Sequence, residues 1–153
     1  MQTDTTRLRE LTVRYSVRKN GEGQALTMGR LLSNSTDAAS VLLELLQDEP
    51  AEVFGILCLT TKLRVIAYHE VSRGTLDSTS AHPRDVFRTA ILANAASIVL
   101  AHNHPSGDPS PSPDDVALTR TLVAAGGIIG IDVLDHIIVA DGRYVSFRQL
   151  GRL

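Results

Sequence analysis

The 153-residue sequence contains one cysteine, no tryptophan and a formal net charge of only −2. A single cysteine cannot form a disulfide within the chain, and the apolar residues around Cys58 predict a buried, unreactive thiol suited to a reducing compartment. No apolar run approaches the ~20 residues that span a bilayer, and the N-terminus does not begin a signal-peptide pattern. We therefore expect a cytoplasmic protein without membrane contact, whose small net charge gives the whole molecule no bias towards polyanions.

What the sequence does contain is enough apolar material for one core. Hydrophobic residues make up 43% and charged residues 21%, which is ordinary for a globular protein. A chain of this length fits one domain. We expect residues 1–34 to form an N-terminal strand and loop extension, and residues 35–153 to form the main domain.

Positive charge is concentrated in the N-terminal part, where apolar and polar residues alternate from Leu11 to Arg18 and predict a half-buried strand. The basic residues there are Arg7, Arg9, Arg14, Arg18 and Lys19. Such a strand could contact nucleic acid, although positive charge more commonly protects a solvated edge strand. The same strand could pair with a second copy of the chain, which would give a homodimer.

The rest of the chain alternates between helical and strand patterns. Helices are predicted from about residue 35 to before Pro50, over 83–96 and over 114–125, with Gly126-Gly127 as the last C-cap. Strands are predicted over 52–59, 63–70, 97–101, 128–140 and 144–147, with a hairpin turn at Asp141-Gly142. This order predicts an α/β fold, in which a mixed β-sheet is covered by helices on both faces.

Two histidines follow the predicted strand at 97–101. His102 and His104 stand two residues apart on extended backbone, so both imidazoles point to one side and can reach one ion. After a proline-rich loop, a carboxylate of the pair Asp114-Asp115 could complete a set that suits zinc and leaves a fourth position for water.

A zinc-bound water needs a general base, for which Glu52 is the best-placed carboxylate and Glu70 the alternative. Residues 102–115 can also be interpreted without a metal site. The histidines could end a strand before a surface turn, the acidic pair is typical of a helix N-terminus, and Ser112 could be only an N-cap. Periodicity does not separate these interpretations.

Residue types and spacing together resemble a known family. The run His102-x-His104-Pro105, six residues, Ser112, two residues and Asp115 is similar to the signature of JAMM (JAB/MPN) metalloproteases. Residues 52–57 resemble the strand that carries the catalytic glutamate of that family. Over about residues 35–153 the chain is most similar to bacterial RadC-like proteins. The matching pieces are Gly74-Thr75, His82-Pro83-Arg84, residues 101–108, Leu134-Asp135-His136 and residues 144–147.

This resemblance implies a JAMM/MPN, cytidine-deaminase-like fold and a zinc metallopeptidase that cleaves an amide or isopeptide bond in a peptide or protein conjugate. His102, His104 and Asp115 would bind Zn²⁺. Glu52 would move the proton of the water, and Ser112 would donate a hydrogen bond to the developing oxyanion.

Some matching residues receive no catalytic role. Asp135-His136 is expected to be a structural polar pair or a supporting partner of the site. Asn103 and Ser106 would lie near the metal without an assigned role.

The resemblance also leaves other functions open. RadC proteins typically carry an N-terminal helix-hairpin-helix DNA-binding module, whereas the first 34 residues here predict a strand and loop. A second hypothesis is an accessory factor in DNA repair or mobile-element biology, which binds nucleic acid with little or no peptidase activity. A third is a domain that keeps zinc for structure or peptide binding without turnover.

Overall fold

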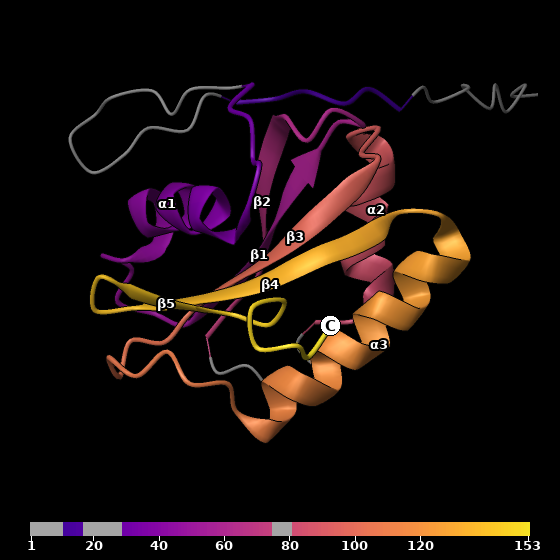
Figure 1. The fold of residues 1–153 in the computed structure, drawn as a ribbon. Coiled ribbons are helices and arrows are strands. Elements are labelled where there is room, and N and C mark those ends of the chain that lie inside the picture. Colours follow the sequence, from indigo (N-terminus) through magenta and orange to yellow (C-terminus); the bar gives the residue numbers. More distant parts are fainter. Residues whose placement is uncertain (1–10, 17–28, 75–80) are drawn as a thin grey trace, which may run out of the picture.

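The computed structural model describes residues 11–16, 29–74 and 81–153, which form a five-stranded sheet with three helices (Figure 1). The elements are α1 (Ser35–Leu46), β1 (Val53–Leu59), β2 (Val65–Arg73), α2 (Pro83–Leu92), β3 (Ser97–Asn103), α3 (Pro113–Ile129), β4 (Asp132–Ala140) and β5 (Arg143–Ser146). The strand order is β2-β1-β3-β4-β5, in which β3 and β4 pair in parallel and the other neighbours pair antiparallel. The sheet is therefore mixed, as predicted.

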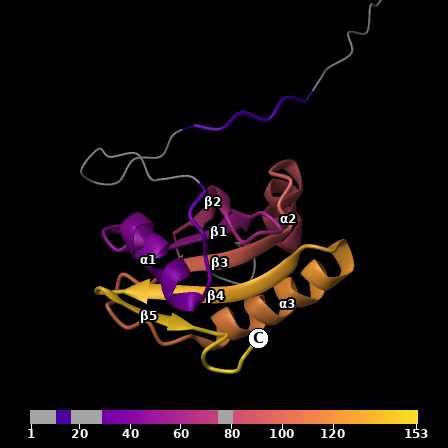
Figure 2. The ribbon, with the colours of Figure 1, turned by 45° about the horizontal axis from the view of Figure 1, so that its top comes forward.

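Helices cover both faces of this sheet. Helix α1 lies on one face, whereas α2 and α3 lie on the other (Figures 1 and 2). On the first face Leu42 of α1 packs with Leu57 in one apolar cluster, and on the second Phe87 of α2 and Leu122 of α3 pack with Leu100 in another. Strands β1 and β3 are buried along their whole length, as expected of central strands between two helical layers.

The N-terminal segment differs from its prediction. Residues 11–16 have no strand assignment, and Leu11, Val13 and Tyr15 are 76%, 42% and 56% exposed, so the predicted half-buried strand is wrong for these residues. Alternation marks two chemically distinct faces, but a strand also needs a neighbour to bond its backbone and to cover its apolar face. Residues 17 and 18, and most of the basic residues near them, lie outside the described part of the chain.

Two helix ends also differ from the predictions. Helix α2 ends at Leu92 rather than near 96, because Asn94 adopts a left-handed conformation with φ of 53°. Helix α3 continues through Gly126 and Gly127 and ends at Ile129. Its C-cap is Gly130, which adopts a left-handed conformation with φ of 83°. Across the described residues, no helix is long and apolar enough to cross a membrane.

Gly126 serves close packing rather than helix termination. A Cβ at this position would lie 2.5 Å from the backbone oxygen of Ile131 and 3.3 Å from Cζ of Phe87. A Cβ at Gly127 would meet no atom within 4 Å. The first glycine therefore allows α3 to approach the start of β4 and helix α2, and the second contributes only backbone freedom.

These neighbouring glycines predict opposite effects of one substitution. Gly126→Ala should lower the free energy of unfolding by about 1–3 kcal/mol, because backbone must shift to admit the methyl group. Gly127→Ala should raise it by about 0.5–1 kcal/mol, because alanine loses less entropy in a helix. Urea denaturation of both variants checks this pair, and equal effects would contradict the packing role of Gly126.

Candidate metal centre

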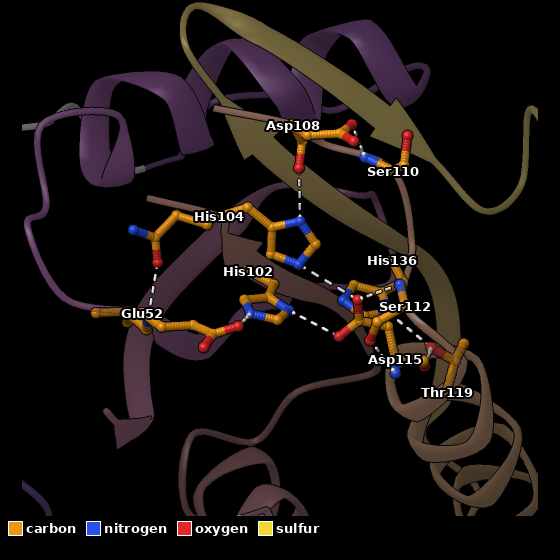
Figure 3. Close-up of polar contacts among 11 residues, drawn as sticks. Glu52, His102, His104, Asp108, Ser110, Ser112, Asp115, Thr119 and His136 are labelled. Atoms are coloured by element: carbon orange, nitrogen blue, oxygen red, sulfur yellow. Dashed lines mark hydrogen bonds and ion pairs between the residues drawn. The ribbon is translucent and has the colours of Figure 1, made fainter. Parts of the chain in front are cut away.

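Segments far apart in the sequence bring polar side chains together where β3 ends (Figure 3). Glu52 directly precedes β1, His102 lies in β3, His104 follows β3, and Asp115 lies in the first turn of α3. The antiparallel pairing of β1 with β3 places Phe54 opposite His102, which carries the neighbouring Glu52 to the same end of the sheet.

His102 lies between the two carboxylates. Its ring is completely buried, with Nε2 2.8 Å from Oε1 of Glu52 and Nδ1 3.2 Å from Oδ1 of Asp115. Nε2 of His104 lies 3.3 Å from Oδ2 of Asp115. Ligand atoms of Glu52, His102 and His104 also lie within 4.8 Å of one another, so this group could hold a metal ion.

Asp115 is only 1% exposed and takes part in the capping box that begins α3. The Ser112 amide donates to Oδ2 of Asp115 at 2.8 Å, and the Asp115 amide donates to Oγ of Ser112 at 3.1 Å. Burial alone would raise the pKa of Asp115, but the contacts with His102, His104 and the Ser112 amide outweigh burial and hold this pKa far below its usual value. The carboxylate is therefore ionised, as a metal ligand must be.

His104 is oriented by the loop that follows it. Its Nδ1 donates to the carbonyl oxygen of Asp108 at 2.8 Å, which leaves Nε2 directed at Asp115. The hydrogen bond with Asp115 is the largest cause of a raised pKa at His104. Arg143 of β5 donates to the carbonyl of Gly107 at 2.7 Å and so ties this loop to the sheet. A carbonyl that fixes the tautomer of a ligating histidine is the usual arrangement in metal sites.

The structure separates the residues that the sequence left as alternatives. Asp115 is buried beside both histidines, whereas Asp114 is exposed. Glu52 lies against His102, whereas Glu70 pairs with Arg73 at 2.8 Å. Ser112 is the N-cap of α3. Its Oγ accepts a hydrogen bond in that role, which leaves the hydroxyl hydrogen available for donation.

Sequence reasoning missed Thr119, and it expected His136 only as part of a structural polar pair or as a supporting partner of the site. The Thr119 hydroxyl donates to the carbonyl oxygen of Asp115 at 2.6 Å, so Nδ1 of His136, 2.7 Å away, must donate to Oγ1 of Thr119. The His136 ring is fully buried, stacks on Phe147 with ring centroids 4.6 Å apart, and has no hydrogen bond at Nε2. The pattern Asp135-His136 marked the position, but no spacing rule connects it to Thr119.

Asp135 and His136 act on opposite faces of β4. Oδ2 of Asp135 accepts hydrogen bonds from the hydroxyls of Ser35 and Ser146, both at 2.7 Å. These bonds tie the start of α1 to β5. Asp135 thus joins structural elements away from the histidines, whereas His136 supports the turn of helix that carries Asp115.

Comparison with known proteins identifies the family. A family model described as RadC-like JAB domain matches residues 32–152, and the chain belongs to this family. This finding confirms the resemblance, and the mixed sheet with three helices is consistent with the JAB/MPN fold.

Curated relatives carry the name UPF0758 protein. The relative from Moorella thermoacetica is 48% identical over 130 residues, which cover 84% of this chain and 57% of that protein. The relative from Desulforamulus reducens is 50% identical over 115 residues, covering 75% and 51%. The relative from Methanosarcina mazei is 43% identical over 122 residues, covering 80% and 53%. The chain spans about half the length of these relatives.

Burial of His136 predicts a pH dependence of stability. Burial, followed by the nearby His102, lowers the pKa of His136 from 6.5 to about 3. The unfolded chain therefore binds one more proton than the folded chain between these values, and stability falls as the pH decreases through this window, by about 1.4 kcal/mol per pH unit.

His136→Asn isolates this contribution, because asparagine retains an N–H donor near Thr119 and does not titrate. Urea denaturation of the metal-free proteins between pH 6.5 and pH 4 should give a flatter stability curve for the variant. Parallel curves for the two proteins would show that His136 is not held neutral by the fold.

Proposed function

We propose that the chain is a zinc-dependent hydrolase of the JAMM metallopeptidase type, which cleaves an amide or isopeptide bond. The observation that carries this proposal is the buried carboxylate of Asp115, which lies within 3.3 Å of a ring nitrogen of both His102 and His104. Membership of the RadC-like JAB domain family supports the same conclusion.

The donor set fits zinc. Two imidazoles and one carboxylate are common ligands of catalytic zinc, and three protein ligands leave a position for water. Nδ1 of His102 is buried without a hydrogen bond in good geometry, and a cation held by this histidine would offset the cost of that burial. His102, His104 and Asp115 would hold the ion.

Asp115 is a better third ligand than Glu52. Asp115 contacts both histidines and its side chain is 2% exposed, whereas Glu52 contacts His102 and its side chain is 28% exposed. A ligand benefits from a fixed, buried position, and a proton carrier needs access to water and substrate. These differences favour ligation by Asp115 and proton transfer by Glu52.

The residues of the chain would then divide the chemistry. Bound zinc would supply a Lewis acid that lowers the pKa of a water molecule towards ~7. The carboxylate of Glu52 takes a proton from the attacking water and delivers it to the leaving amine. The hydroxyl of Ser112 donates a hydrogen bond to the oxyanion as it develops. His104, oriented by the Asp108 carbonyl, and Asp115, held in the capping box, stay in place through the reaction.

Metal content tests the site directly. Elemental analysis of the wild-type chain, purified and supplied with zinc at neutral pH, should give about one zinc per chain. The variant His102→Ala/His104→Ala should lose it, because the carboxylate alone binds zinc weakly. His69→Ala, which removes an exposed histidine of β2, is the matched control and should keep it. Absence of zinc from the wild-type chain would make the hydrolase proposal untenable.

The two candidate carboxylates give a second test. Glu52→Gln should keep zinc but lose turnover by about 10²–10⁴-fold, because it removes the proton acceptor. Glu70→Gln is the matched control and should retain turnover, since Glu70 is engaged with Arg73. Both variants are compared with wild type on substrates found among fluorogenic peptides and isopeptide-linked conjugates. Unchanged turnover in Glu52→Gln would refute the assignment of the base.

A further inference from the structure

Asn103 lies between the two histidines in sequence, but its side chain serves a different segment. Adjacent residues of a strand point to opposite faces, so Asn103 points away from the side shared by His102 and His104. The residue is 3% exposed. Its Oδ1 accepts a hydrogen bond from the amide of Val53 at 2.6 Å, and its Nδ2 donates to the carbonyl oxygen of Ala51 at 3.0 Å.

These hydrogen bonds hold the backbone on both sides of Glu52. The partners Ala51 and Val53 are its two chain neighbours, and Nδ2 also lies 3.3 Å from the carbonyl oxygen of Glu49. The carbonyl oxygen of Glu52 itself accepts from the Gly74 amide at 2.8 Å. Residues 47–52 belong to no helix or strand, so side-chain and loop contacts take the place of regular backbone bonding here.

These hydrogen bonds begin where the pairing of β1 with β3 stops. Strands β1 and β3 pair from Leu59 opposite Ser97 to Phe54 opposite His102, and Val53 opposite Asn103 would come next. There the Val53 amide bonds to the side chain of Asn103, while β1 stays paired with β2 on its other side, where Val53 lies opposite Arg73. Only an amide side chain offers both the acceptor and the donors that this arrangement uses, and an ionised aspartate offers no donor.

We propose that Asn103 is a positioning residue, which sets the place of the Glu52 carboxylate relative to the two histidines. The inference rests on the proposed function of the site, because it assigns Asn103 a role through the base. The histidines themselves are held independently. Strand β3 pairs with β4 through His102 and Asn103, and the His104 amide donates to the carbonyl oxygen of Val139 at 3.0 Å. Loss of the Asn103 side chain should therefore disturb Glu52 and leave metal binding intact.

Cobalt substitution tests this role without a known substrate. The visible absorption of Co²⁺ reports on its ligand field, and Glu52 lies 2.8 Å from His102, so removing or moving the Glu52 carboxylate should change the spectrum. The full chain is loaded with Co²⁺ at pH 7 as wild type, Glu52→Gln, Asn103→Ala and the double variant. Ser35→Ala is the control, because it removes a hydrogen bond to Asp135, which lies on the face of β4 opposite to His136.

We expect every protein to bind one Co²⁺ and Ser35→Ala to keep the wild-type spectrum. Asn103→Ala should change the spectrum in the same direction as Glu52→Gln, and the double variant should match Glu52→Gln alone, because both changes act through one carboxylate. On a substrate that the wild type hydrolyses, Asn103→Ala should lose about 100-fold in kcat with KM unchanged.

Each contrary result has a distinct meaning. A wild-type spectrum for Asn103→Ala, or changes that add in the double variant, would overturn the role of Asn103 and leave the proposed function standing. Failure of the wild-type chain to bind Co²⁺ would overturn both. If Asn103→Ala does not fold, Asn103→Asp takes its place, since it keeps an acceptor for the Val53 amide and loses the donors to Ala51 and Glu49. A wild-type spectrum for that folded variant would equally overturn the inference.

Discussion

A carboxylate removed from water costs several kcal/mol unless donors and positive charge surround it, and Asp115 is 1% exposed. The compensation comes from the Ser112 amide, the N-terminus of α3 and the imidazoles of His102 and His104. The requirement fixes where α3 begins. It also fixes the path of the proline-rich loop, which must return the chain from His104 to Ser112 across the end of β3. The start of the helix and the candidate metal centre thus share the same carboxylate.

Separate parts of the fold hold the two histidines, Asp115 and Glu52 in place. Parallel pairing of β3 with β4 holds the histidines, and the capping box, supported by Thr119, holds Asp115. The side chain of Asn103 forms hydrogen bonds with Ala51 and Val53, the residues on either side of Glu52. Each support consists of hydrogen bonds within the chain, and none of these bonds involves an ion. Such preorganisation is what metal binding and proton transfer require.

The sequence was most informative where a local rule applied. Strand alternation predicted that His102 and His104 share a side, and the resemblance to the JAMM signature singled out Asp115 and Glu52 as their partners. The roles of Asn103 and Thr119 escaped prediction, because the partners Val53 and His136 lie 50 and 17 positions away and the contacts depend on sheet register and helix docking. Gly126 was mistaken for a cap because composition does not reveal close packing against Ile131. Nucleic-acid contact and self-association, which were inferred from the N-terminal segment, stay predictions.

The central claim is that one zinc ion is held by His102, His104 and Asp115, with Glu52 outside the ligand set. Anomalous diffraction at the zinc edge, from crystals of the zinc-loaded chain, tests it most directly. The account predicts one peak at ~2.0–2.2 Å from a nitrogen of each histidine and an oxygen of Asp115. A peak ligated by Glu52 in place of Asp115, or a peak at other residues, would contradict it.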